Sequence, residues 1–240
     1  MPIDVDGVIF HKSDLMEHGH NPYFSPNVFL VEQPPNIKLR THCHRQNQFQ
    51  LFIDGDAQFG RHAIGALTVH YAGAYTGYGP LISGPRGLTY LTLRPIFDTD
   101  KLNMPENIAD MIRGPKRQLS SATIPAADVD TLANCTEVSS LELIARQHDH
   151  VAACLYTLPA GGQHCGLDPS GSGGQFYVVV AGAMMCDDRV LRRPASVFVR
   201  ADEPPFEMYA AEGGLQVVCL QLALTQEVYR HSSNRPHALC

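Results

Sequence analysis

Short apolar runs, separated by glycine, proline and polar residues, follow one another along most of the chain. Runs of this kind, rich in Val, Leu, Phe and Tyr and bounded by turn residues, are typical of β-strands. The first 27 residues are polar and rich in turns, and we expect this arm to pair or pack at a sheet edge. The pattern predicts an all-β fold, with strands over 27–31, 48–55, 87–94, 141–146, 151–158 and 175–182.

One segment between the strands has a different pattern. Apolar residues at 108, 111 and 112 lie on one face of a helix over 105–113, which would begin at Pro105 and end before Gly114. The remainder, up to Val138, is polar and rich in Ser and Thr. We therefore expect one short helix inside a linker between two β domains.

The two halves of the chain carry similar blocks in the same order. The matched pairs, at offsets of 127, 127 and 128 residues, are 48–55 with 175–182, 87–88 with 214–215, and 68–69 with 196–197. Three blocks in one order at nearly one spacing indicate a duplicated unit.

The segment Thr41–Gly55 carries the clearest candidate chemistry. On a strand, His42 and His44 point to the same face because side chains alternate with period two, which is the geometry of a metal-ligand pair. Gln48 lies four residues after His44, and Gly55 lies seven residues after Gln48. This spacing resembles the first motif of the cupin family, which has two histidines one residue apart, then a glutamate, then a glycine.

The resemblance covers both halves, and it implies a bicupin with two cupin-like barrels (double-stranded β-helix or jelly-roll) in tandem. In the second half, His42–His44 aligns with His164–Gly166, where glycine replaces one histidine. We therefore expect the second barrel to be degenerate and structural. The implied divisions are an N-terminal arm over 1–27, barrel 1 over 28–96, a linker with a short helix over 97–140, barrel 2 over 141–225, and a C-terminal tail over 226–240.

The resemblance also implies a divalent transition metal (Fe, Ni, Mn or Zn) in the first barrel, with His42 and His44 as ligands. Gln48 stands at the position of the cupin glutamate, where its amide oxygen would be a weak, neutral ligand. Thr76 falls where the second cupin motif places a third histidine. His62 or His70 could complete the metal shell if its strand brings it inside, and we take His70 as the candidate ligand.

Polar aromatic residues gather where the pocket of a cupin barrel would open. Tyr71, Tyr75 and Tyr78 can hold a carboxylate or a phenol by hydrogen bonds, or stack on an aromatic substrate. We take Tyr78, Thr76 and Gln48 as candidate catalytic residues. The alternatives are that the tyrosines are ordinary strand residues, that His62 lies at the surface, and that His70 is a hydrogen-bonded core residue.

Composition argues against several classes of protein. The net charge of −6 provides no basic field for nucleic acid, and no apolar segment reaches the roughly 18 residues of a membrane span. The N-terminus has no basic region followed by an apolar one, so we expect a cytoplasmic protein without a membrane partner. The seven cysteines include no C-x-x-C pair, and we expect no disulfide framework.

Two functions remain open from the sequence. The first is a metal-dependent enzyme, dioxygenase-like or isomerase-like, that acts on a small oxygenated or aromatic molecule in the N-terminal barrel. The second is a non-catalytic bicupin that has lost its metal and binds a small molecule or serves as a scaffold, with metal-independent acid–base catalysis as a variant. For either function we expect a homodimer, formed through exposed barrel edges.

Overall fold

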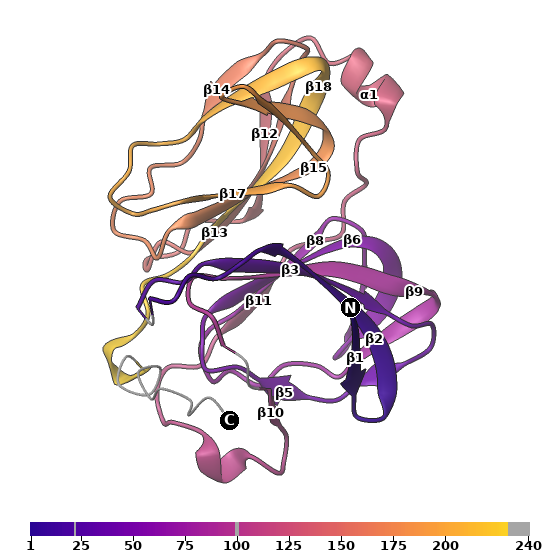
Figure 1. Ribbon diagram of the computed structural model, residues 1–240, viewed down its shortest axis with the longest axis vertical. Helices are drawn as coiled ribbons and strands as arrows, with labels where there is room; N and C mark the ends of the chain where they lie inside the picture. Colours follow the sequence, from indigo (N-terminus) through magenta and orange to yellow (C-terminus); the bar gives the residue numbers. More distant parts are fainter. Residues whose placement is uncertain (22, 99–100, 230–240) are drawn as a thin grey trace. The chain divides into compact units, whose positions relative to one another are not determined.

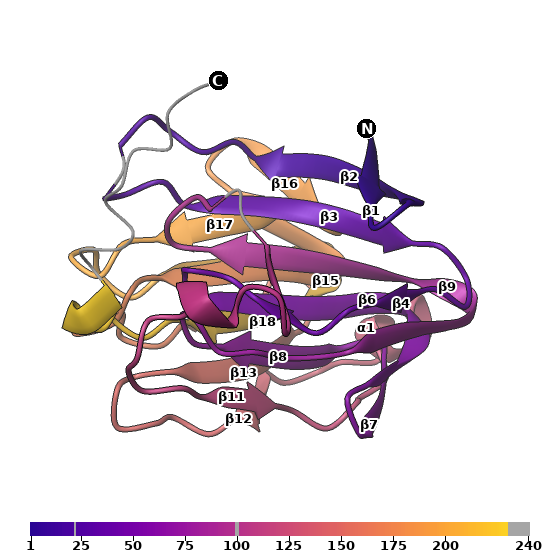
Figure 2. The ribbon, with the colours of Figure 1, turned by 90° about the horizontal axis from the view of Figure 1, so that it is seen from below.

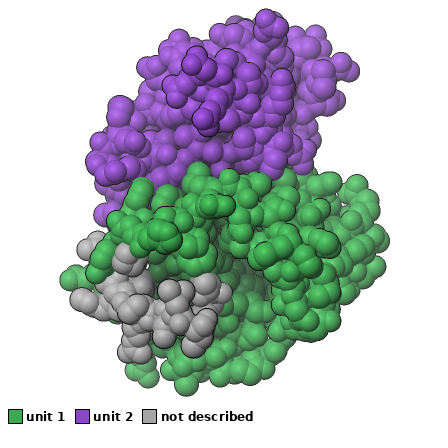
Figure 3. Space-filling view, viewed as in Figure 1, with its two compact units in different colours: residues 1–124, 225–240 green, residues 125–224 purple. Residues whose placement is uncertain are grey.

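The computed structural model describes residues 1–21, 23–98 and 101–229. The chain forms two compact units (Figure 3). Unit 1 contains Met1–Ile124 and the segment from Thr225, and unit 2 contains Pro125–Leu224. Both units are built almost entirely from strands, so the all-β prediction is confirmed. Within the described residues, no helix is long and apolar enough to cross a membrane.

Unit 1 is a curled sheet around one apolar core (Figure 1). Its strands are β1 (Pro2–Val5), β2 (Val8–Met16), β3 (Asn27–Gln33), β4 (Lys38–Leu39), β5 (His42–Cys43), β6 (Gln48–Phe59), β7 (His62–Gly65), β8 (Thr68–Ala72), β9 (Leu81–Arg94), β10 (Leu102–Asn103) and β11 (Gln118–Ser120). The main sheet runs β1-β2-β3-β9-β6-β8-β11, with β4 on β9 and β7 on β6 (Figure 2). Phe10 of β2, Leu39 of β4 and Ile64 of β7 belong to one buried cluster, because the sheet bends around it. Within the segment taken as an arm, β2 pairs antiparallel with β3 of the sheet.

Unit 2 repeats this strand order. Its elements are α1 (Val129–Ala133), β12 (Ser139–Ile144), β13 (Ala152–Leu158), β14 (Gln163–Cys165), β15 (Gln175–Cys186), β16 (Arg189–Arg192), β17 (Ser196–Val199) and β18 (Glu207–Gln221). The sheet runs β12-β13-β18-β15-β16, with β14 on β18 and β17 on β15. The same arrangement in unit 1 is β2-β3-β9-β6-β7, with β4 on β9 and β8 on β6.

The strand registers confirm the predicted duplication. Phe49 lies opposite Leu93 in unit 1, and the residues 127 positions later, Phe176 and Leu220, lie opposite each other in unit 2. The predicted slip to 128 in the third block is wrong, since β8 and β17 also keep 127. Tyr71 and Phe198 lie opposite Phe49 and Phe176, respectively.

The strand predicted over 48–55 does not end at Gly55. β6 continues to Phe59, and the register with β9 shifts between Gly55 and Ala57, which marks a bulge. Gly55 has a φ of +81°, and a Cβ there would overlap the carbonyl oxygen of Gly87. The strand continues because Ala57 and Phe59 are buried in the unit 1 core.

The predicted helix over 105–113 is also wrong, since only a 3-10 turn, η1 (Ile108–Asp110), forms there. Ile108 is 61% exposed, so the segment has no continuous apolar stripe whose burial would stabilise so short a helix. The α-helix of the predicted linker is α1 instead, capped by Asp128, whose side chain accepts a hydrogen bond from the Thr131 N–H.

Most of the predicted linker and part of the tail belong to the two units. β10 pairs with β5 and β11 pairs with β8, so these strands are part of unit 1. In the predicted tail, the ring of Tyr229 lies 5.3 Å from the ring of Tyr75. Residues 230–240 of that tail lie outside the described residues.

Candidate functional site

The strand β5 brings His42 against Tyr78. The two residues form an isolated β-bridge, in which the His42 N–H donates to the Tyr78 carbonyl at 3.2 Å and the Tyr78 N–H donates to the His42 carbonyl at 3.0 Å. The ring centroids lie 4.7 Å apart, and both residues are buried. The loop that carries Tyr78 is therefore attached to the histidine pair by its backbone.

His42 and His44 point into the same region, with ring centroids 5.2 Å apart. The Nδ1 atom of His42 lies 2.7 Å from the Arg40 carbonyl oxygen, which only accepts, so Nδ1 donates and Nε2 keeps its lone pair. Burial lowers the pKa of His42 to about 4, so the ring is neutral at pH 7. The Nδ1 atom of His44 lies 3.9 Å from a carboxylate oxygen of Asp98.

The amide of Gln48 connects Tyr78 to a buried arginine. Its Nε2 donates to the Tyr78 hydroxyl at 2.5 Å, and its Oε1 accepts from the Arg94 Nε at 3.0 Å. Arg94 also donates from Nη1 to the backbone carbonyl of Asp98 at 2.6 Å. Burial raises the pKa of Tyr78, so its phenol stays protonated at neutral pH.

His42, His44, Tyr78 and Arg94 border a cavity of about 370 Å³, which we call the barrel cavity. The face of unit 1 drawn in Figure 3 is hollowed. The polar lining of the barrel cavity includes His42, His44, Gln50, Tyr78, Arg94 and Lys101. The carboxylates of Asp4 and Asp6 line it as well, and the aromatic rings of Phe10, Phe29 and Tyr90 form part of the wall.

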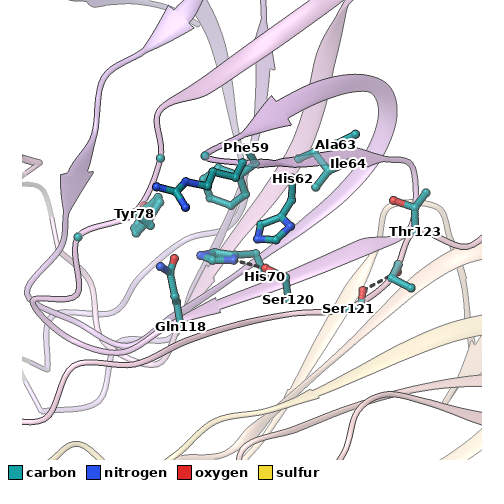
Figure 4. Close-up of a pocket in the computed structure, with 15 residues that line it drawn as sticks. Phe59, His62, Ala63, Ile64, His70, Tyr78, Gln118, Ser120, Ser121 and Thr123 are labelled. Atoms are coloured by element: carbon teal, nitrogen blue, oxygen red, sulfur yellow. Dashed lines mark hydrogen bonds between the residues drawn. The ribbon is translucent and has the colours of Figure 1, made fainter.

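His70 lies in a different cavity of about 680 Å³, which we call the hairpin cavity (Figure 4). Its Nδ1 is 2.8 Å from the Ser120 hydroxyl, and its buried Nε2 has no hydrogen-bond partner among the described residues. Burial lowers the pKa of His70 to about 3. Exposed His62 lines the same cavity, and Tyr78 lines both cavities. The structure therefore does not bring His70 into the barrel cavity with His42 and His44.

The other predicted polar residues have structural partners elsewhere. The Thr76 hydroxyl accepts the Arg117 N–H at 3.0 Å, and Thr76 lines neither cavity. The Tyr71 ring lies 5.1 Å from the ring of Phe49, and Tyr75 packs with Tyr229. Of the predicted aromatic cluster, only Tyr78 faces the cavities.

The donor set fits a resident divalent ion only in part. His42 and His44 supply two imidazoles, but the Gln48 oxygen already accepts a hydrogen bond from Arg94, and His70 lies in the other cavity. Within the described part of the chain, no three His, Cys, Asp or Glu side chains come together as a metal site. A divalent ion normally takes at least three protein ligands, and the nearby guanidinium would repel it.

Sequence reasoning missed Arg94, Gln50 and Lys101. A signal for Arg94 was present, because Tyr90, Thr92 and Arg94 alternate along β9 and share one face of the strand. The sequence pattern did not show that this face points into the barrel cavity.

No protein-family model matches the sequence, and no curated protein sequence matches it. Solved structures do match the whole architecture. A mutant form of oxalate decarboxylase from Bacillus subtilis has a TM-score of 0.54 and 12% identity, covering 94% of this chain and 75% of that chain. A putative dioxygenase from Nostoc punctiforme has a TM-score of 0.51 and 12% identity, with 90% and 84% covered. The chain has the cupin fold. For salicylate 1,2-dioxygenase from Pseudoaminobacter salicylatoxidans, the match has 10% identity and a TM-score of 0.51, and it covers 85% of this chain and 73% of that chain.

The second cupin unit differs from the predicted alignment. His164 of β14 lies opposite Met208, just as Leu39 of β4 lies opposite Leu81, and Met208 follows Leu81 by 127 residues. His164 therefore matches Leu39 rather than His42. The predicted alignment matched residues by identity, since both segments contain His followed by Cys. The structural match is set by the pairing of β14 with β18, which sequence similarity does not show.

Proposed function

We propose that unit 1 of this cupin binds a small oxygenated molecule in the barrel cavity without catalysing a reaction on it. The cavity of about 370 Å³ lies within the range of small-molecule sites, roughly 300–1,000 Å³. Apolar and aromatic walls combined with a few polar groups are the usual composition of such sites.

The protonation states of the cavity groups support binding over acid–base catalysis, and this observation carries the proposal. A general acid or base works best with a pKa near the working pH. Burial lowers the pKa of His42 to about 4 and raises that of Tyr78, so both stay neutral at pH 7. Arg94 stays a cation, because a guanidinium keeps its proton at neutral pH.

A thermal-shift series with small carboxylates, phenols and their neutral analogues tests this function. A ligand that binds the folded state alone raises the midpoint of unfolding with its concentration. We expect at least one probe to do so equally well before and after treatment with a chelator. Binding that disappears with the chelator and returns with added metal would contradict the proposal.

A second candidate function is metal-dependent chemistry, dioxygenase-like or isomerase-like, at His42 and His44. The observation that favours it is the hydrogen bond from His42 Nδ1 to the Arg40 carbonyl, which leaves the Nε2 lone pair to coordinate a metal, as in metal-bound histidines. The same fold occurs in the Bacillus subtilis oxalate decarboxylase, one structure of which is described by its Mn(II) centres. Here a bound molecule would have to supply the missing ligands.

Metal analysis distinguishes the two candidates. The second candidate requires close to one metal ion per chain in the purified protein, and a clear loss in both His42→Ala and His44→Ala. His62→Ala, which removes an exposed imidazole outside the barrel cavity, is the matched control. If none of the three substitutions changes the metal content, the metal-dependent candidate is contradicted and the binding function stands.

A further inference from the structure

The barrel cavity contains a deeply buried positive charge. Arg94, the last residue of β9, is only 4% exposed. Transferring a charge out of water is costly, and a side chain in this position is retained only when partners compensate for it. The hydrogen-bond partners of Arg94 within the protein therefore show how much of its capacity is left for a ligand.

Arg94 has spare hydrogen-bonding capacity. Within the described residues, its contacts to the Gln48 amide and the Asp98 backbone carbonyl use two of the five guanidinium N–H groups. Both of these acceptors are uncharged. Burial lowers the pKa of Arg94 and the nearby Asp98 carboxylate raises it, so that carboxylate compensates part of the charge. The same carboxylate accepts the Arg45 N–H at 2.8 Å, and Asp98 does not line the barrel cavity. Donors of Arg94 thus remain for a molecule in the cavity that it lines.

Unit 2 shows that the fold does not need this charge. The residues 127 positions after Gln48 and Arg94 are Gln175 and Gln221, and they also lie opposite each other, at the ends of β15 and β18. The Gln175 Nε2 donates to the Gln221 Oε1 at 2.7 Å. The pair is completed by the Tyr177 hydroxyl and by the carbonyls of residues 150 and 167, so it is neutral and its amide groups are all paired. Unit 1 places a cation where unit 2 has an amide.

The rest of the barrel cavity suits an anionic group with a further polar atom. Lys101 is paired with Asp6 at 3.1 Å, near the more exposed β1, so these charges compensate each other. Asp4 accepts the Gly7 N–H at 2.8 Å within the same hairpin. The buried Oε1 of Gln50, which lines the cavity, has no partner among the described residues and can accept a ligand hydroxyl or N–H.

From these contacts we infer that Arg94 is a built-in cation that pairs with the carboxylate of a small ligand in the barrel cavity. This inference rests on the proposed binding function and adds the chemical class of the ligand. In this arrangement Gln48 orients the guanidinium without neutralising it, which a glutamate at the cupin position would do. Bidentate pairing with a planar guanidinium is the typical way in which proteins recognise carboxylates.

Isothermal titration with matched probes tests the inference. Benzoate and acetate carry the carboxylate, and benzamide and acetamide are their neutral counterparts of similar shape. We expect the full chain to bind the better carboxylate at least about thirty-fold more tightly than its amide, the size expected for a buried charge pair. Equal affinity for both members of each pair would overturn the carboxylate inference and leave the binding function standing. Absence of binding by all four probes would overturn both.

Arg94→Gln gives unit 1 the amide pair found in unit 2. We expect it to unfold at a urea concentration no lower than that of the parent, and to lose the preference for carboxylates.

Gln48→Glu is a second, nearly isosteric variant that would place a carboxylate beside the Arg94 Nε, and it should weaken benzoate binding at least about tenfold. Arg86→Gln, an equal charge change on the same strand with a 72% exposed side chain, should bind as the parent does. A folded Arg94→Gln protein that keeps full benzoate affinity would refute the inference.

Discussion

Tyr78 separates the two polar cavities of unit 1 and contacts residues on both sides. Its ring lies 4.7 Å from His42 in the barrel cavity and 5.5 Å from His70 in the hairpin cavity. Its hydroxyl is the acceptor for the Gln48 amide. This single side chain therefore explains why two histidines that the sequence placed in one metal site belong to different cavities.

Removing the Tyr78 hydroxyl is expected to destabilise the protein. In Tyr78→Phe the buried Gln48 Nε2 loses its acceptor, and an unpaired buried donor costs about 1–3 kcal/mol. Urea unfolding of the variant measures this cost. Tyr90→Phe is the control, because the structure records no hydrogen bond of the Tyr90 hydroxyl within the described residues, and it should stay within about 0.5 kcal/mol of the parent.

His70 is expected to make the protein sensitive to acid. Its pKa falls from 6.5 to about 3 on folding, so below pH 6.5 the unfolded chain binds a proton that the folded state does not. The free energy of unfolding should therefore fall by up to about 1.4 kcal/mol per pH unit as the pH drops from 6.5 toward 3, and show no contribution from His70 above that window.

The slope of unfolding free energy against pH isolates this contribution. His70→Gln should have a slope between pH 6 and pH 4.5 that is shallower by about one proton, whatever its absolute stability. His62→Gln removes the exposed imidazole of the same cavity and should keep the parent slope. An unchanged slope in the first variant would mean that the folded protein accommodates a charged His70.

At the scale of elements, a pair of glycines marks the crossing of the two longest strands in each unit. Gly55 of β6 approaches the carbonyl of Gly87 in β9, and Gly182 of β15 approaches that of Gly214 in β18. Both strands bulge next to the contact. Glycine is required there because of the positive φ and because no Cβ can fit against the opposing backbone.

Gly55→Ala is expected to destabilise the protein by about 3 kcal/mol or more, since it combines a left-handed backbone with a clash against backbone atoms. Chemical denaturation measures the change. Gly77→Ala is the control in the same unit, because a Cβ at Gly77 meets no atom within 4 Å and its φ lies outside the left-handed region. Similar losses in both variants would show that the close approach to Gly87 is not the cause.

At the scale of the whole molecule, the two copies of the duplicated unit differ in what fills their interiors. Both units share one strand order and register, but they fill the matching interior positions differently. The interior of unit 2 is an apolar cluster with a neutral amide pair, and that of unit 1 contains histidines and a guanidinium. Unit 1 therefore contains buried polar groups, which cost stability, at interior positions where unit 2 has apolar or neutral residues.

Hydrogen exchange locates the ligand within the molecule. With saturating benzoate, we expect slower amide exchange in β6 and β9 of unit 1 and no change in β15 and β18 of unit 2, because Arg94 of β9 lines the barrel cavity and unit 2 has the neutral Gln221 at the matching position. Arg94→Gln under the same conditions should show no protection. Protection confined to unit 2 would place the binding site in the other copy of the fold.

The amino-acid sequence by itself determined the strand content, the duplication and the cupin resemblance. Alternation of apolar residues is a local property that follows from the geometry of a strand. The common offset of 127 residues is found by comparing residue identities in the two halves of the chain. The pairing of His42 with His44 followed from a predicted strand, but β5 ends at Cys43, and the two rings nevertheless lie 5.2 Å apart. These features needed no knowledge of what packs against them.

Tertiary structure alone decided which polar residues meet. His70 is kept from the histidine pair by the loop that brings Tyr78 between them, and Arg94 reaches Gln48 because β6 and β9 are neighbours with a specific register. The prediction of a helix over 105–113 was wrong for a related reason. Burial against distant residues, rather than local periodicity, determines whether a marginal helix forms. Contacts between residues far apart in sequence depend on the closure of the sheet, which no local pattern records.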